Sequence, residues 1–237
     1  MRILAFETSA KAASAALLSD GTLTGEFFQN SGETHSRTVM KLAENLLQSC
    51  ALSPADVDYV AWANGPGSFT GVRIGAAAAK GFCWGKSIPG LPVSTLESMA
   101  WNVVDLEGVI CCCMDARRSQ VYNALFCAEH GQLTRLCEDR AISLQALEED
   151  LRRFSDRPVR LVGDGALLTW NTLHERFANM LLVSEHLRQQ RAAGVVLAGW
   201  QAVLQGKVEN AALSVPQYLR LSQAERERLE KERIKGE

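Results

Sequence analysis

Residues 62–75 read WANGPGSFTGVRIG, an apolar strand that runs into a glycine turn and then into a helix of small residues. Glycines let backbone N–H groups come close to an anion at a helix N-terminus, where unpaired amides and the helix dipole favour negative charge. The small residues that follow, at Gly71, Gly75, Ala78 and Ala79, share one helical face and let another helix pack closely. The stretch therefore predicts either a phosphate site or a docking surface.

Three enzymatic motifs come near this stretch but fail on spacing. A nucleophile elbow around Ser68 requires glycines where the chain has Pro66 and Thr70. A dinucleotide-binding fingerprint that starts at Gly65 and Gly67 requires its last glycine at position 70, but the chain has it at Gly71. Residues 81–87 resemble a P-loop but are one residue too short, and they lie at the end of a predicted helix instead of after a strand. The near absence of charge over 74–79 favours the docking surface. Anion or nucleotide binding by Gly65, Gly67 and Ser68 remains the alternative.

Outward from this stretch, the sequence predicts two similar halves. Strands are expected over 2–8, 12–19 and 22–28, and again over 108–114, 120–128 and 132–137, with hairpin turns at Gly21 and Gly131. Glu7 and Asp115 end the first strand of each set. We therefore predict an internal duplication that forms two tandem α/β lobes of the actin, Hsp70 and sugar-kinase class, each a mixed sheet with helices. The lobes are expected over 1–105 and 106–222, with a charged tail over 223–237.

The remaining segments predict the helices that cover these sheets. Helices are expected over 34–50, 68–84, 143–154 and 186–205, with shorter ones after Ser94 and Gly165. Short strands are expected over 58–63, 88–93, 159–162 and 180–183. Ser94 and Glu97 match a capping box at the start of their helix.

Composition excludes several classes of protein. With 237 residues, 47% of them hydrophobic, the chain can bury a large core, and its net charge of -2 argues against unaided high-affinity binding to nucleic acid. No apolar run is long enough for a signal peptide or a membrane span. Seven cysteines without a Cys-x-x-Cys pair indicate reduced core residues in a cytoplasmic protein; they are Cys50, Cys83, Cys111, Cys112, Cys113, Cys127 and Cys137.

The chemistry of individual side chains points away from a metal enzyme. None of the four histidines has another histidine four residues on, so we predict no metal site. Because the enzymatic motifs also fail on spacing, we predict no catalytic residue. Glu7 and Asp115 either hold Mg²⁺ through water in an ATPase cleft or cap local turns. The loop after Glu7, residues 8–13, has no glycine with which to approach a phosphate, which weakens the ATPase interpretation.

Five segments together resemble the bacterial TsaB family, also called YeaZ, over essentially the full length: residues 7–9 (ETS), 33–36 (ETHS), 64–75, 115–118 (DARR) and 216–220 (PQYLR). The resemblance implies a non-catalytic subunit of the machinery that forms N6-threonylcarbamoyladenosine (t6A) at position 37 of tRNAs reading codons that begin with adenine. It implies pairing with the related catalytic subunit TsaD and with the ATPase TsaE, indirect contact with tRNA, and a homodimer when the chain is alone.

The resemblance also implies a partner surface on the first two long helices, and some side chains of these helices must instead face the lobe's own sheet. The candidate partner residues are His35, Val39, Ala43, Leu46, Leu47, Gly71, Val72, Gly75, Ala78 and Ala79. The catalytic relatives bind a metal through two histidines on one helix, whereas here Val39 stands four residues after His35. No cofactor is required, and weak binding of ATP or ADP with Mg²⁺ is left open. The alternative function is a stand-alone ATPase or kinase that uses Glu7 and Asp115.

Overall fold

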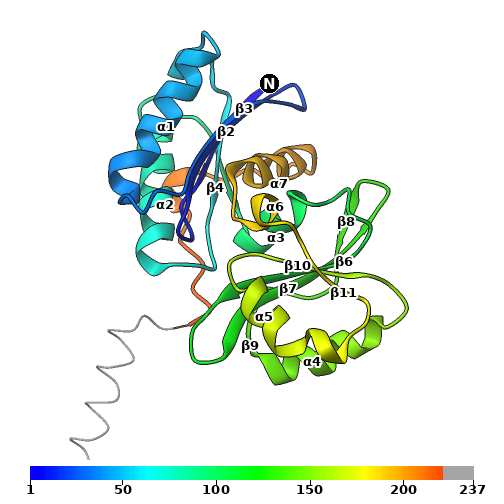
Figure 1. Cartoon of the computed structure of the whole chain (residues 1–237). Coiled ribbons are helices and arrows are strands. Elements are labelled where there is room, and N and C mark those ends of the chain that lie inside the picture. Colours follow the sequence, from blue (N-terminus) through cyan, green and yellow to red (C-terminus); the bar gives the residue numbers. More distant parts are fainter. Residues whose placement is uncertain (221–237) are drawn as a thin grey trace, which may run out of the picture.

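The computed structural model describes residues 1–220, which form two α/β lobes, each built on its own mixed sheet (Figure 1). The expected charged tail over 223–237 lies outside the described residues. The fold is the two-lobed α/β class that the sequence predicts.

The first lobe is organised around a five-stranded sheet in the order β3-β2-β1-β4-β5. Three strands form an antiparallel meander, β1 (Arg2–Glu7), β2 (Ala13–Ser19) and β3 (Thr22–Gln29). The strands β4 (Tyr59–Ala63) and β5 (Gly90–Val93) extend the sheet in parallel on the other side of β1. Nearly every residue of β1 and β2 is buried, because helices cover both faces of this sheet.

The second lobe contains six strands, with the order β11-β10-β6-β7-β8 and β9 also paired to β7. Their bounds are β6 (Gly108–Asp115), β7 (Gln120–Glu129), β8 (Gln132–Arg135), β9 (Arg140–Ser143), β10 (Val159–Val162) and β11 (Met180–Leu182). The strands β6, β7 and β8 are antiparallel, whereas β10 runs parallel to β6.

The two sheets confirm the predicted duplication. Each begins with a three-stranded meander whose first strand then pairs in parallel with a later strand, β4 in one lobe and β10 in the other. The predicted hairpin turns are equivalent too, because Gly21 has φ 82° and Gly131 has φ 71°, the left-handed conformation that such turns require.

Helices α1 (His35–Ser49) and α2 (Phe69–Trp84) lie beside each other on one face of the first sheet (Figure 1). They bury one hydrophobic cluster against the sheet, including Leu4, Phe6 and Trp62. The second sheet carries α4 (Leu144–Leu151) and α5 (Ala166–Leu173) on one face, and α3 (Thr95–Trp101) on the other. Short 3₁₀ turns lie at Pro54–Asp56 (η1), Arg152–Phe154 (η2), His174–Arg176 (η3) and Ala211–Leu213 (η4).

Helix α7 (Ala192–Leu204) corrects the expected lobe boundary. The sequence predicts this helix in the second lobe, yet it packs across β1, β2, β4 and β5 of the first sheet. Its residues are apolar on several sides, and Val195 and Val196 fill a cluster with Ile3 and Leu91. The second face of the first sheet is apolar and must be buried by another element. The chain therefore returns to the first lobe after β11, and α7 buries this face.

The long helix expected over 186–205 is in fact two helices, α6 (Glu185–Arg188) and α7, separated at residues 189–191. Contacts with the first lobe fix the start of α7. The Ala192 N–H donates to Ser14 Oγ at 2.8 Å, and the Ala193 N–H donates to Glu26 Oε1 at 3.0 Å. Such contacts supply the partners that the first N–H groups of a helix lack.

The region around residues 140–154 also differs from the expectation. A fourth antiparallel strand, β9, lies there unpredicted, and the helix after it is shorter than expected because a 3₁₀ turn follows Leu151. The predicted Ser94 cap is confirmed, since Ser94 Oγ accepts the Glu97 N–H at 3.2 Å. The Glu97 carboxylate, however, pairs with Arg135 at 2.8 Å instead of completing the capping box.

All seven cysteines are free thiols, as the sequence predicts. Cys83, Cys111, Cys112 and Cys113 are buried, and the remaining three are half-buried.

Candidate functional site

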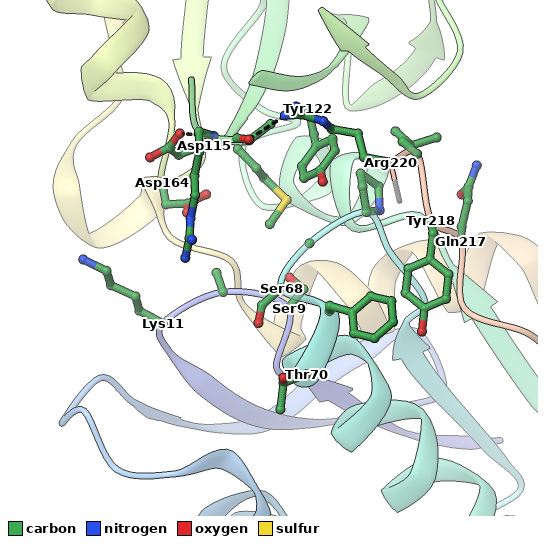
Figure 2. A pocket seen from close by; sticks show the side chains of 18 residues that line it. Ser9, Lys11, Ser68, Thr70, Asp115, Tyr122, Asp164, Gln217, Tyr218 and Arg220 are labelled. Carbon is green, nitrogen blue, oxygen red and sulfur yellow. Dashed lines mark hydrogen bonds between the residues drawn. The ribbon is translucent and has the colours of Figure 1, made fainter. Parts of the chain in front are cut away.

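A cleft of about 550 Å³ lies between the two lobes (Figure 2). The first lobe contributes the loop after β1, including Ser9 and Lys11, and the start of α2. The second lobe contributes the end of β6, Tyr122 on β7 and Asp164 after β10. One side is closed by residues 214–220, here called the C-terminal strap, of which 217–220 line the cleft.

The glycine run that decides the fold packs against the chain itself. A Cβ on Gly71 would stand within 3.0 Å of the Thr8 carbonyl oxygen, and one on Gly75 would meet Thr8 Oγ1 at 2.5 Å. A Cβ on Gly67 would meet the Ser9 carbonyl oxygen at 2.6 Å. Gly65, with φ 108°, faces the Gln217 carbonyl of the strap. These glycines are therefore required for close packing inside one chain.

The predicted anion site is only partly assembled in the cleft. Ser68 lines it, but the Ser68 N–H donates to the Ser9 carbonyl at 2.7 Å, and Ser68 Oγ accepts the Gly71 N–H at 3.3 Å. Gly67 lines the cleft as well, whereas Gly65 lies under the strap. An anion at the α2 N-terminus would have to displace the bond between Ser68 and Ser9 or bind beyond it.

The two predicted carboxylates end equivalent strands but have different surroundings. Asp115 is exposed and lines the cleft, with its Oδ1 accepting the Arg117 N–H at 2.7 Å. Glu7 is 0% exposed and lies behind Ser9, whose N–H donates to Glu7 Oε1 at 2.5 Å. Burial, with a smaller effect of nearby Asp164, raises the pKa of Glu7 to about 7.

Asp164 is a cleft residue that the sequence reasoning did not select. Gln190 Nε2 donates to Asp164 Oδ1 at 2.7 Å, and the walls of the cleft raise the pKa of this carboxyl by desolvation. A signal was present, because the turn at residues 163–165 follows β10 and opens α5 just as the glycine run follows β4 and opens α2. Aligning the two halves over these turns would have placed Asp164 at the cleft.

The C-terminal strap was also missed as a wall of the site. Its Gln217 N–H donates to the Asn64 carbonyl at 2.7 Å, and Asn64 Nδ2 donates to the Val215 carbonyl at 2.9 Å. Arg220 crosses to the second lobe and donates to the Ala116 carbonyl at 2.6 Å. The strap thus closes one side of the cleft by bonds to both lobes. The residues in these contacts lie at least 104 positions apart in the sequence, so no local pattern could reveal them.

Comparison with known proteins places this chain in a family. Residues 29–228 match the family model described as "TsaD: tRNA N6-adenosine threonylcarbamoyltransferase". The "tRNA threonylcarbamoyladenosine biosynthesis protein TsaB" of Bacillus subtilis is 34% identical over 98% of this chain and 100% of its own length. The chain belongs to the TsaB family.

Solved structures extend the likeness to the fold. A Pseudomonas aeruginosa protein described as similar to peptidase YEAZ has a TM-score of 0.77 at 24% identity, over 92% of this chain and 99% of that one. Component A of (R)-2-hydroxyglutaryl-CoA dehydratase from Acidaminococcus fermentans has a TM-score of 0.50 at 11% identity, over 86% and 99%. The TsaB-family chain therefore shares its two-lobed fold with both of these proteins.

The partner surface that the TsaB resemblance implies has to be corrected residue by residue. Four apolar side chains of α1 point into the first lobe's own core and are at most 3% exposed: Val39, Ala43, Leu46 and Leu47. Val72 and Ala79 are buried in the same lobe, while Gly71 and Gly75 face Thr8. Of the ten residues, only His35 and Ala78 are partly exposed to solvent. These buried residues pack within the first lobe and support its fold.

His35 serves a structural role in the TsaB-family chain. One ring nitrogen, Nε2, lies 2.8 Å from the Ala10 carbonyl, which ties the start of α1 to the loop at the cleft. Within residues 1–220, no three His, Cys, Asp or Glu side chains gather in a way that could hold a metal ion. No helix in this part of the chain has the length and apolar character needed to cross a membrane.

Proposed function

We propose that this chain is a non-catalytic subunit in t6A formation at position 37 of tRNA, which binds and activates the catalytic subunit TsaD together with the ATPase TsaE. Family membership over the full length supports the pathway, because the Bacillus relative is named for t6A biosynthesis. The proposal implies action in the cytoplasm, and a homodimer when TsaD is absent.

The observation that carries the docking proposal is the exposed face of α1 and α2, here called the outer face. On α2 it comprises Arg73, Ala77, Gly81 and Trp84, which recur at helical spacing. On α1 it includes Met40, which is 44% exposed, while Trp84 is 83% exposed. Large exposed apolar side chains beside an alanine and a glycine suit the close approach of partner helices. The related fold that the TsaD family model implies would offer the matching pair of helices.

A Gly81→Leu substitution tests this docking. A Cβ on Gly81 would meet nothing within 4 Å, so the added side chain leaves the lobe intact and projects from the outer face. We expect at least a tenfold loss of affinity for TsaD and a matching loss of t6A formation. The control is Asn171→Leu, at an exposed position of α5, which should bind TsaD normally. Full TsaD binding by a folded Gly81→Leu variant would reject docking through the outer face.

The non-catalytic part of the proposal has its own support and test. Of the two carboxylates that the rival ATPase hypothesis uses, only Asp115 lines the cleft, because Glu7 is wholly buried. The Ser68 N–H at the start of α2 is already bonded to the Ser9 carbonyl. We expect no ATP hydrolysis by the isolated chain, and at most weak binding of ATP or ADP with Mg²⁺. Turnover that disappears with Asp115→Asn would establish the rival function instead.

A further inference from the structure

The hairpin between β6 and β7 has an unusual tip. Arg117, Arg118 and Ser119 have φ values of 62°, 55° and 56°, three consecutive residues other than glycine in the left-handed region. Side chains disfavour this conformation, and it persists only where the surrounding structure holds it. Residues held in this conformation cluster at active sites, ligand clamps and switch regions.

Several bonds fix this tip in place. The Ala116 N–H donates to the Gln120 carbonyl at 3.0 Å, and the Gln120 N–H donates to the Arg117 carbonyl at 3.2 Å. Arg220 of the strap donates to the Ala116 carbonyl at 2.6 Å. The side chains of Arg117 and Arg118 are exposed at the end of this braced turn, so two adjacent guanidinium groups are presented in advance of any ligand.

Positive charge gathers around the tip. Lys11, Arg117 and Arg220 line the cleft, and Arg118 stands beside Arg117; these four side chains are here called the basic rim. Within residues 1–220, none of the four forms an ion pair with a carboxylate. The basic rim carries four positive charges, whereas the cleft beside it holds two carboxylates, Asp115 and Asp164. This excess of positive charge is local, because the net charge of the whole chain is -2. A polyanion is therefore the ligand that the local charge favours.

Aromatic rings behind the rim favour RNA over an acidic protein surface. Tyr122 and Tyr218 lie on the same side of the cleft as Arg220, as Figure 2 shows. Phe69 and Tyr218 also lie against each other, with ring centroids 4.7 Å apart. Cations next to aromatic side chains are the combination by which proteins hold RNA phosphates and stack its unpaired bases.

We propose that the basic rim binds the phosphate backbone of tRNA directly, which rests on the proposed role of this chain in tRNA modification. Arginine forks hold phosphate oxygens in pairs, and such contacts position an RNA without reading its sequence. The chain then places tRNA for its catalytic partner as well as docking to it. This contact goes beyond the indirect role that the family resemblance implies.

The test is a titration of labelled tRNA by the complex of this chain with TsaD, over a series of KCl concentrations. The Arg117→Gln/Arg118→Gln variant should bind tRNA about tenfold more weakly, and the slope of log affinity against log salt should become shallower by about one per lost phosphate contact. The matched control is Arg152→Gln/Arg153→Gln, an adjacent pair on η2 that is 67% and 65% exposed and should retain wild-type affinity and slope.

Three outcomes overturn the proposal: an unchanged affinity and salt slope in the rim variant, an equal loss in the control, or a rim variant that loses TsaD and not tRNA. The last result would assign the rim to an acidic protein surface. Should wild-type chain fail to bind TsaD, the proposed function fails, and the same titration with the isolated chain still decides whether the rim binds tRNA.

Discussion

Arg73 and Tyr218 lie 145 positions apart in the sequence, and Arg73 Nε donates to the Tyr218 hydroxyl at 2.8 Å. The same guanidinium lies 3.8 Å from the centre of the Phe69 ring, which packs on Tyr218. The pair fastens the C-terminal strap to the helix that the glycine run opens. It also joins the outer face of α2 to the wall of the cleft, since Arg73 belongs to one and Tyr218 to the other.

A double-mutant cycle measures this fastening. Arg73→Ala and Tyr218→Ala should each lower the free energy of unfolding by about 1 kcal/mol, with a coupling energy of about 1 kcal/mol, because each removes the other's cation–π and hydrogen-bond partner. Urea unfolding monitored by tryptophan fluorescence gives the free energy of unfolding of the wild type, the two single variants and the double variant. Tyr218→Phe is the control that keeps the ring and removes only the hydroxyl bond. Additive single effects would show that the two side chains do not stabilise each other.

Two glycines of one helix should respond oppositely to alanine. Gly71→Ala places a Cβ within 3.0 Å of the Thr8 carbonyl, which forces the backbone apart and should cost about 1–3 kcal/mol, as overpacking does. Gly81→Ala meets nothing within 4 Å and should add about 0.5–1 kcal/mol through helix propensity. Thermal unfolding of both variants checks the pair. A stable Gly71→Ala protein would mean that the loop after β1 can move away from α2.

Stability should fall as pH rises through the range in which Glu7 ionises. The pKa of Glu7 is about 7 in the folded chain and 4.5 as its ordinary value, so the protonated carboxyl is favoured by folding. Its contribution is fully present below about pH 4.5 and is lost by about pH 7. Glu7→Gln keeps the oxygen that accepts the Ser9 N–H and removes the charge, so it should be more stable than wild type at pH 8 by at most about 3 kcal/mol.

The measurement is the free energy of unfolding from urea titrations at several pH values. The two proteins should converge towards pH 4.5 and diverge above it. Glu149→Gln, an exposed carboxylate on α4, is the control and should follow the wild-type curve. Parallel curves for Glu7→Gln and wild type would show that this buried carboxyl does not govern the pH dependence.

Local patterns were sufficient for most of the framework, as particular residues show. Gly21 and Gly131 marked equivalent hairpins because a tight turn needs positive φ, a constraint of the turn itself. Ser94 marked the start of α3 because its hydroxyl caps a nearby N–H. The split between α6 and α7 was not visible, since it depends on Ser14 and Glu26 from the first lobe capping Ala192 and Ala193.

For the candidate site, too, local patterns predicted some features and tertiary contacts decided the others. Asp115 could be placed at the cleft because it ends a strand that the duplication pairs with β1. The duplication could not show that Glu7, its equivalent, turns behind Ser9 and becomes fully buried. Nor could helical periodicity decide which apolar stripe of α1 faces a partner, because a core stripe and a docking stripe have the same spacing.

The sequence by itself determined the family, the duplicated lobes and the position of the strand, turn and helix over residues 62–75, because motifs, turn chemistry and hydrophobic period are local properties. Tertiary structure alone decided what the glycines serve. They admit the backbone of Thr8, Ser9 and Gln217 at distances that a Cβ would prevent. A glycine in the sequence indicates only that another group packs closely against the backbone. The folded structure shows that, at these positions, the group belongs to the same chain.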